Sequence, residues 1–380
     1  MKRNLLLTPG PTELPFEVCE ALGRPIIHHR TTQFQEHIKE AVEGLKYIFQ
    51  TKNDVYILTC SGTGAMEASV CNLLSPGDKA IAVEGGKFGE RWSELCQTYK
   101  VNAHIVKIDW GKAVQASQIE KLLKADPSIK AVFITLCETS TGVTPDVQAI
   151  AKVVAASNAV LVLDAISGLG VVDVQTDNWG IDVVVTGSQK GLMLPPGLAM
   201  VSVSSKALKL IEQSTNPRYY FDLREAKKAA EKTDTPFTPA IGIIIALNES
   251  IRLMKKSGLQ NLFAHYARLA QALRAAVVAL NLKVFTDSSC LSNVLTAISL
   301  PENIDGEKLM KVMRDTYGIT IAGGQDKMKG KMIRIAHMGM LDEFDILTGI
   351  SCLEKVLHQM GHPFELGSGL AAAQKELNSK

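Results

Sequence analysis

The sequence predicts an α/β protein in which a large, doubly wound, mostly parallel sheet is followed by a smaller α+β unit. Between residues 55 and 203, short runs rich in β-branched residues alternate with longer stretches of helical periodicity. Most of these runs are apolar without polar alternation, which is typical of strands covered on both faces. The alternation stops near Ser205, and the length of 380 residues fits two domains at roughly 150 residues each.

The N-terminal and central elements follow from this pattern. The first fifteen residues are expected to form an extended arm, because Pro9, Pro11 and Pro15 exclude a helix there. Apolar side chains at helical spacing predict a helix over 34–49. The strands of the sheet are expected at 55–58, 79–83, 103–108, 131–136, 159–163, 183–186 and 198–203, with helices between them at 65–74, 90–99, 118–125 and 147–157.

The pattern changes in the second half of the chain. Residues 206–232 are expected to be helical and charged, and a Thr/Pro-rich turn at 233–239 leads into a helix over 241–256. We expect a large domain over 16–258 and a small α+β domain over 259–380. The small domain is expected to contain helices at 259–280, 306–317 and 343–360, strands at 283–286, 295–300 and 332–335, and a frayed Gly/Ala-rich tail at 366–380.

The composition excludes several classes of protein. Lys and Arg number 41 against 39 Asp and Glu, so the net charge of +2 gives no reason to expect nucleic acid or an acidic membrane as a partner. No apolar run approaches the roughly 18–20 residues of a membrane span, and the N-terminus is a poor signal peptide. Seven cysteines without a C-x-x-C pair argue against disulfides and a zinc site, and favour reduced thiols in the cytoplasm.

A candidate anion site lies in the segment T-C-S-G-T-G-A-M-E at 59–67, between a predicted strand and a predicted helix. Free N–H groups and the positive end of a helix dipole meet at such a junction. Ser61 and Thr63 add hydroxyl groups, and Gly62 allows close approach of the backbone. The segment suits a phosphate but lacks the lysine of a P-loop. A tight turn capped by Ser61 or Thr63 explains the pattern equally well.

Two ionisable residues follow strands further along the chain. Asp164 ends an apolar strand, and the carboxyl ends of parallel strands are where α/β sheets bind ligands. Taken alone, it is more easily explained as a helix N-cap. Lys190 lies between an apolar strand and a Pro/Gly turn, where burial would lower its pKa and make the amine nucleophilic. The simpler alternative for a lone lysine is a surface charge.

The three features are more specific together than apart. A phosphate cradle, then an aspartate, then a lysine match the needs of pyridoxal 5′-phosphate. The lysine forms the Schiff base with this cofactor, and the aspartate keeps the pyridine nitrogen protonated. We therefore expect pyridoxal 5′-phosphate as the cofactor.

At this point the chain resembles a known family over nearly its whole length, from Leu7–Thr12 to Met332–Ile335. The segments S-G-T-G-x-x-E, L-D-A and G-S-Q-K occur in the order found in class V, fold-type I aminotransferases. The resemblance is closest to the alanine–glyoxylate / serine–pyruvate (serine–glyoxylate) group. It implies the fold of the fold-type I pyridoxal-phosphate-dependent transferases and transamination of alanine or serine with glyoxylate or pyruvate. It also implies a homodimer with shared active sites.

The resemblance implies a role for individual residues. Lys190 and Asp164 would be catalytic, and Arg334 would bind the substrate carboxylate, with Gly10 and His29 near the substrate. Phe88 stands where many relatives have Trp, and Thr235 stands where some relatives have Tyr. The implied cofactor-binding residues are Ser61, Gly62, Thr63, Phe88, Thr139, Asp164, Ile166, Gln189, Lys190 and, reaching across the dimer, Thr238.

Other interpretations remain open for some residues and for the whole chain. Phe88 is also explained as a core aromatic, Arg334 as a surface ion pair, and His29 as a packing or capping residue. A cysteine desulfurase is disfavoured because Gln189 precedes Lys190 and no cysteine precedes Arg334 nearby. The remaining alternatives are a 2-aminoethylphosphonate–pyruvate aminotransferase and a non-catalytic subunit of a complex on the same fold.

Overall fold

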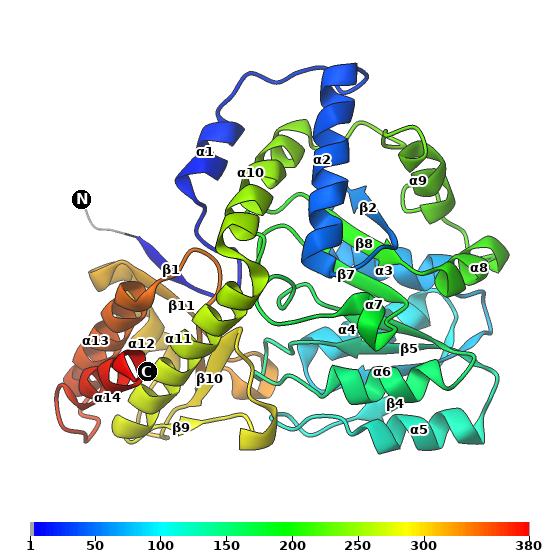
Figure 1. The fold of residues 1–380 in the computed structure, drawn as a ribbon. Helices are drawn as coiled ribbons and strands as arrows, with labels where there is room; N and C mark the ends of the chain where they lie inside the picture. Colours follow the sequence, from blue (N-terminus) through cyan, green and yellow to red (C-terminus); the bar gives the residue numbers. More distant parts are fainter. Residues whose placement is uncertain (1–3, 380) are drawn as a thin grey trace.

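The computed structural model describes residues 4–379, so the predictions made for 1–3 and 380 lie outside the described residues (Figure 1). The large sheet has the strand order β2-β8-β7-β6-β5-β3-β4. Strand β8 is antiparallel to both of its neighbours, and the other pairs are parallel, as predicted. The strands are β2 (Asp54–Leu58), β3 (Lys79–Glu84), β4 (Asn102–Lys107), β5 (Ile129–Thr135), β6 (Val160–Asp164), β7 (Val183–Gly187) and β8 (Ala199–Val203).

Helices cover both faces of this sheet because its strands are apolar on both sides. In β6, Leu161 and Leu163 belong to one core cluster, while Val160 and Val162 belong to another. The first face is covered by α1 (Phe16–Leu22), α2 (Thr32–Phe49), α5 (Ala116–Ala125), α6 (Val147–Ala155) and α10 (Ile241–Ser257). The second is covered by α3 (Gly62–Leu73), α4 (Lys87–Thr98), α8 (Ser205–Gln213) and α9 (Leu223–Ala230), and the short α7 (Thr176–Trp179) follows β6.

A second sheet has the order β1-β11-β12-β10-β9. The N-terminal arm supplies its edge strand, β1, which pairs in parallel with β11, and the other pairs are antiparallel. We keep residues 16–258 and 259–380 as the proposed division, with a break at Gly258 between α10 and α11. The elements are β1 (Leu5–Leu7), β9 (Lys283–Val284), β10 (Leu295–Ser299), β11 (Ile319–Gly323), β12 (Met332–Ala336), α11 (Leu259–Ala279), α12 (Gly306–Tyr317), α13 (Glu343–Gln359), α14 (Ser368–Asn378) and the 3₁₀ turns η1 (Ser288–Cys290) and η2 (Asp326–Met328).

The prediction of a frayed tail was wrong, because residues 368–378 form α14. Its small residues allow close packing, and Gly369, Ala373 and Leu377 are buried. The Glu354 carboxylate accepts hydrogen bonds from the N–H groups of Gly367 and Leu370 and so holds the start of the helix. The segment 206–232, expected to be helical throughout, contains two helices with a non-helical stretch at 214–222.

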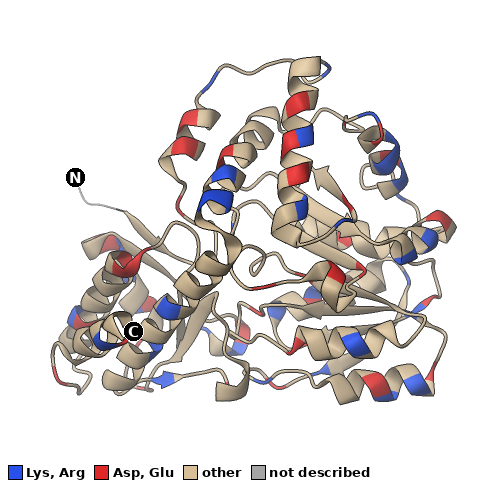
Figure 2. Ribbon diagram, viewed as in Figure 1, with Lys and Arg blue, Asp and Glu red and all other residues tan. Residues whose placement is uncertain are grey.

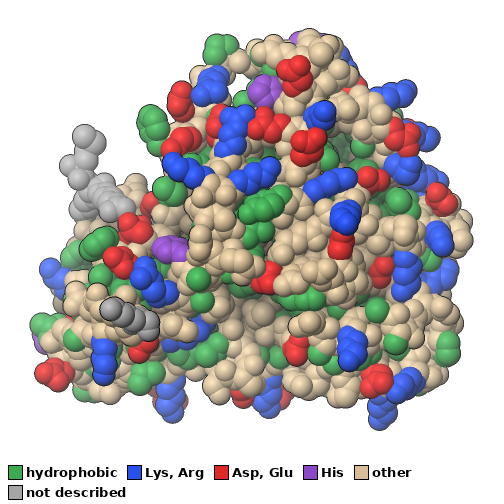
Figure 3. Space-filling view, viewed as in Figure 1, with side chains coloured by type: hydrophobic (Ala, Val, Ile, Leu, Met, Phe, Trp, Pro, Cys, Tyr) green, Lys and Arg blue, Asp and Glu red, His purple; other side chains and the backbone are tan. Residues whose placement is uncertain are grey.

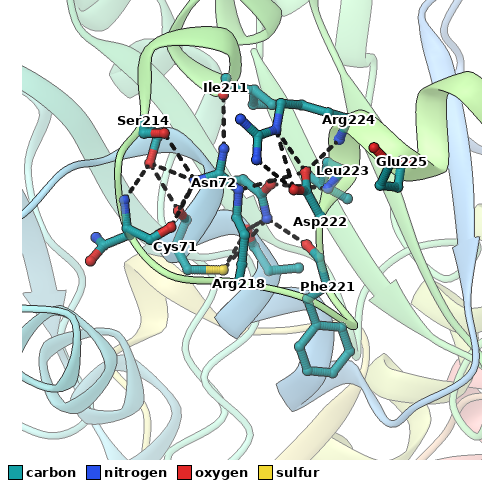
Figure 4. Close-up of polar contacts among 12 residues, drawn as sticks. Cys71, Asn72, Ile211, Ser214, Arg218, Phe221, Asp222, Leu223, Arg224 and Glu225 are labelled. Carbon is teal, nitrogen blue, oxygen red and sulfur yellow. Dashed lines mark hydrogen bonds and ion pairs between the residues drawn. The ribbon is translucent and has the colours of Figure 1, made fainter.

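This stretch fixes the position of α3 (Figure 4). The guanidinium of Arg218 donates to the carbonyl of Cys71 in the last turn of α3, and the Asn72 amide donates to the carbonyl of Phe221. At the other end of α3, a Cβ added to Gly64 would lie 2.9 Å from the ring of Phe221. The loop therefore holds both ends of the helix whose N-terminus was predicted to bind an anion.

Charges of both signs are mixed over the face of the molecule shown in Figures 2 and 3. Across residues 4–379, none of the helices combines the length and the apolar character needed to cross a membrane.

Candidate active site

The N-terminus of α3 is formed as an anion site requires. Ser61 is the N-cap with an extended backbone, but its side chain makes no capping hydrogen bond. The first N–H groups of a helix have no partner within the helix, so they are available to a ligand. The hydroxyl of Thr63 accepts a hydrogen bond from Arg91, with 3.2 Å between Oγ1 and Nη1.

Two of the predicted residues lie against this helix end. A Cβ added to Gly62 would lie 2.6 Å from the side chain of Ile166. A Cβ added to Gly187 would lie 3.1 Å from Gln189 Oε1 and 3.4 Å from the backbone nitrogen of Gly62, so the glutamine amide lies beside the start of α3. Gln189 Oε1 is buried and has no hydrogen-bond partner among the described residues. A buried polar atom without a partner is costly and indicates a place for a ligand.

Asp164 lies at the carboxyl end of β6, with 3% of its surface exposed. Burial raises the pKa of this carboxyl group to about 7, and the nearby charge of Glu138 adds to the shift. Three effects lower the pKa of Asp164 in part: the N–H of Ile166, which donates to Asp164 Oδ1 at 2.9 Å, and the positive charges of Arg91 and Lys190. No helix begins at the residues that follow Asp164, so it is not a helix N-cap.

Lys190 follows β7 and is half-buried, and the contacts of its amine argue against the interpretation as a surface charge. Its Nζ donates a hydrogen bond to the carbonyl of Pro9 in the N-terminal arm. Burial lowers the pKa of the amine to about 8, and the positive charges of Arg334 and Arg91 also lower it, while Asp164 opposes the shift. A larger fraction of this amine than of a free lysine is therefore uncharged near neutral pH.

Arg334 is 6% exposed and makes hydrogen bonds to backbone carbonyls. Its Nη1 donates to Thr139 at 2.7 Å and its Nε donates to Gly323 at 2.7 Å. Burial lowers the pKa of the guanidinium. No carboxylate within residues 4–379 forms an ion pair with it, so the interpretation as a surface ion pair is wrong.

Phe88 is half-buried beside Glu138, a buried carboxylate that sequence reasoning did not single out. Glu138 Oε2 accepts hydrogen bonds from the N–H groups of Phe88, at 3.0 Å, and Gly89, at 2.9 Å. Its other oxygen accepts from the hydroxyl of Ser140 at 2.5 Å. Glu138 comes directly before Thr139, and an acid at the end of an apolar strand was the signal available in the sequence. It fixes the turn that carries Phe88.

Two predicted residues lie apart from this group. The imidazole Nε2 of His29 is 3.5 Å from the hydroxyl of Thr238, which is exposed. Thr238 shares the lining of a small hollow with Thr59, at the end of β2. Within one chain, no described contact links either residue to Lys190 or Arg334. Among residues 4–379, no cluster of His, Cys, Asp or Glu is arranged to hold a metal ion.

The remaining predicted residues converge at the carboxyl ends of β6 and β7. The amine of Lys190 and the buried side chains of Asp164 and Arg334 lie close enough to act on one another electrostatically, and Gln189 lies beside the start of α3. The profile of the family described as Aminotransferase class-V matches residues 12–341. The chain belongs to the class-V aminotransferases. This family depends in general on pyridoxal phosphate, and the predicted family, fold class and enzyme class are confirmed.

Individual relatives align with this chain over nearly its full length. The chain is 42% identical to a protein of Synechococcus sp. (strain PCC 6716) named soluble hydrogenase, small subunit, over 99% of both chains. It is 38% identical to the L-aspartate–glyoxylate aminotransferase of Paracoccus denitrificans (strain Pd 1222), over 98% of this chain and 96% of the other. The crystal structure of ureidoglycine–glyoxylate aminotransferase from Bacillus subtilis superposes with a TM-score of 0.96 at 28% identity, covering 100% of this chain and 99% of that one.

Proposed function

We propose that this class-V aminotransferase uses pyridoxal 5′-phosphate to transfer an amino group from alanine or serine to glyoxylate or pyruvate. The observation that carries the proposal is the position of Lys190: burial lowers the pKa of its amine to about 8, and the charges of Asp164 and Arg334 lie close enough to act on it. Glyoxylate as acceptor is supported by the names of two similar proteins. Alanine and serine as donors follow from the resemblance described above.

The residues present fit this cofactor. The start of α3 offers N–H groups and hydroxyls to a phosphate, and the unpartnered amide oxygen of Gln189 lies beside it. Phe88 is half-buried and Ile166 lies against Gly62, and in this proposal their side chains would flank the cofactor ring. When bound, pyridoxal phosphate supplies a reactive aldehyde and an electron-accepting pyridine ring.

Lys190 and Asp164 have complementary roles in this proposal. Lys190 would hold the cofactor covalently and, once released, carry a proton to and from the α-carbon of the substrate. An amine with a pKa near working pH both accepts and returns a proton readily. Asp164 would hold a proton at the pyridine nitrogen. A buried carboxylate is stabilised by a cation beside it, so the negative charge of Asp164 and the positive charge of the pyridinium would stabilise each other.

Arg334 would bind the α-carboxylate that every donor and acceptor shares. Hydrogen bonds from two of its nitrogens to Thr139 and Gly323 fix the plane of the guanidinium. A fixed planar fork binds a carboxylate bidentately and loses little entropy on binding. Because one site serves both half-reactions, a single arginine suffices for both substrates.

We propose a homodimer in which Thr238, together with His29, completes the partner's site. Both are set apart from Lys190 in their own chain, and Thr238 is exposed. In this arrangement Thr238 reaches the phosphate held by the neighbouring chain, and His29 lies near its substrate. We also propose a cytoplasmic protein, which the seven free cysteines support.

A second candidate function is a subunit of a larger complex, which the name of the Synechococcus relative favours. The presence of both Lys190 and Asp164, close enough for the charge of Asp164 to act on the amine, supports an enzyme over a scaffold. A 2-aminoethylphosphonate aminotransferase would need cations for its phosphonate beyond Arg334, the one cation that this proposal assigns to the substrate.

The test is a steady-state assay of alanine, serine and aspartate against glyoxylate and pyruvate, with the visible absorbance of the cofactor as a second readout. Wild type is expected to turn over and to absorb in the visible range after addition of pyridoxal phosphate. Lys190→Ala is expected to lose both properties, while Lys209→Ala, which changes an exposed lysine, keeps them. Near-wild-type turnover by Lys190→Ala would remove Lys190 from its proposed role.

A further inference from the structure

Arg91 is a cation at the candidate phosphate site that sequence reasoning did not assign. It lies in α4, three residues after Phe88, and its Nη1 donates to the hydroxyl of Thr63 at 3.2 Å. The guanidinium carbon is 5.1 Å from the centroid of the Phe88 ring. Arg91 therefore contacts one residue proposed to bind the phosphate and one proposed to stack on the cofactor ring.

Arg91 forms no ion pair with the residues that the structure describes. Across residues 4–379, no carboxylate oxygen lies within 4.0 Å of its nitrogens. The guanidinium contacts the hydroxyl of Thr63 and the ring of Phe88, which leave its full positive charge in place. It also lies beside the first turn of α3, where the helix dipole is positive and disfavours a cation. An anion between Arg91 and the start of α3 would remove both costs.

The position of Arg91 extends its influence to the catalytic pair. Its charge lowers the pKa of Lys190 and that of Asp164, so it lies within electrostatic reach of both groups. By contrast, Arg334 is held by the backbone of Thr139 and Gly323. The two arginines therefore have different surroundings, and only Arg91 has a hydroxyl of the phosphate cradle as its partner.

We propose that Arg91 binds the phosphate group of the cofactor together with Thr63 and the N-terminus of α3, and this inference rests on the function proposed above. A dianion suits the three donors, because a guanidinium, a hydroxyl and backbone N–H groups all donate. The other anion of suitable chemistry is the distal carboxylate of a dicarboxylic amino acid. The contact with Thr63 favours the phosphate.

The inference is tested on the cofactor-free protein by comparing pyridoxal 5′-phosphate with pyridoxal, which lacks the phosphate. Arg91→Gln is expected to raise the dissociation constant of pyridoxal phosphate by about tenfold or more, the effect of losing a hydrogen bond to a charged group. The dissociation constant of pyridoxal should stay within about twofold of wild type, below the effect of one neutral hydrogen bond. Arg91→Lys should fall between, because it keeps the charge and loses the fork.

Two variants serve as controls. Phe88→Leu removes the ring but leaves the guanidinium, so it is expected to weaken both ligands. Arg314→Gln changes an exposed arginine on α12 and is expected to change neither. Equal weakening of pyridoxal phosphate and pyridoxal in Arg91→Gln would overturn the inference and make Arg91 a support for Phe88. Unchanged affinity for both would also overturn it.

Two further measurements separate the alternatives. If Arg91→Gln raises the KM for aspartate but not for alanine, and leaves cofactor affinity unchanged, Arg91 binds a substrate carboxylate and the inference is wrong. Binding of inorganic phosphate to the cofactor-free protein should weaken in Arg91→Gln. If wild type binds phosphate in an Arg91-dependent way but does not bind pyridoxal phosphate, the proposed function fails while the anion site stands. If wild type binds neither, both fail.

Discussion

Gly10 packs directly against the side chain of Lys190: a Cβ added to Gly10 would lie 2.6 Å from Nζ and 2.6 Å from Cε. The backbone of Gly10 has φ +127°, a conformation that other residues rarely adopt. The carbonyl of the preceding residue, Pro9, accepts the hydrogen bond from Nζ. The N-terminal arm thus fixes the lysine on which the proposed function depends.

Gly10→Ala is expected to displace the Lys190 amine and to lower kcat/KM by about a hundredfold, the effect of moving a reacting group by roughly 1 Å. Gly77→Ala is the matched control, because Gly77 also has a positive φ, +85°, but no atom lies near its added Cβ. Both variants carry backbone strain, and only the first contacts the site. Equal activity of the two variants would show that the contact between Gly10 and Lys190 has no catalytic consequence.

The lowered pKa of Lys190 predicts the pH dependence of cofactor binding. Only the uncharged amine is a nucleophile, so the association rate of pyridoxal phosphate should rise with pH and level off above a midpoint near 8. An unperturbed lysine would give a midpoint near ~10.4. Stopped-flow absorbance between pH 6 and 10 provides the measurement. Arg334→Gln removes a neighbouring positive charge, so its midpoint should lie at a higher pH than that of wild type. A wild-type midpoint at the pH expected for a free lysine would contradict the lowered pKa of Lys190.

Arg334→Lys is expected to lower kcat/KM for alanine, serine, glyoxylate and pyruvate alike. The substitution keeps the charge but loses the planar fork, and the three N–H groups of a lysine could make at most one hydrogen bond to a carboxylate while they keep those to Thr139 and Gly323. Truncating such a charged pair costs on the order of 2–5 kcal/mol, which corresponds to a loss of about thirtyfold or more in kcat/KM. A plain amine without a carboxylate is the control substrate. If its slow reaction suffers as much as that of alanine, Arg334 has a structural role.

Local sequence signals predicted most of the large sheet, because its strands are apolar on both faces and its helices are periodic. They also singled out Lys190, Asp164 and the start of α3 as candidate site residues, since each follows a strand within a short, recognisable motif. Arg91 was not singled out, because its proposed role rests on contacts with Thr63 and Phe88 that only the folded structure shows. The helix α14 was missed, since its small residues gain their stability from packing that the local sequence does not show.

His337 is expected to make the fold sensitive to acid. It is fully buried, and burial lowers its pKa from the usual value to about 3, with the positive charge of Arg274 adding to the shift. Below pH ~6.5 the unfolded chain binds a proton at this residue and the folded chain does not. Its contribution to stability is therefore complete above that pH and is lost as the pH falls towards 3.

The midpoint of urea unfolding, measured between pH 7.5 and 4, tests this prediction. One proton taken up on unfolding corresponds to about 1.4 kcal/mol per pH unit. His337→Asn is expected to be less stable at pH 7.5 but to lose less stability on acidification than wild type. His104→Asn, which changes an exposed histidine on β4, should keep the wild-type slope. A slope in His337→Asn equal to that of wild type would assign the acid sensitivity to other groups.

If the active site is shared as proposed, two inactive variants should restore each other. Lys190→Ala and Thr238→Val are co-expressed with different tags, and the heterodimer is isolated. If Thr238 acts on the partner's phosphate, one site of the heterodimer carries both lesions and the other carries neither. The intact site should then recover up to half of the wild-type activity, provided that Thr238→Val alone is clearly impaired. If Thr238 acts within its own chain, each site carries one lesion and no activity returns. A monomer in sedimentation would exclude the shared site outright, and the exposed hydroxyl of Thr238 would then have to act on its own chain or not at all.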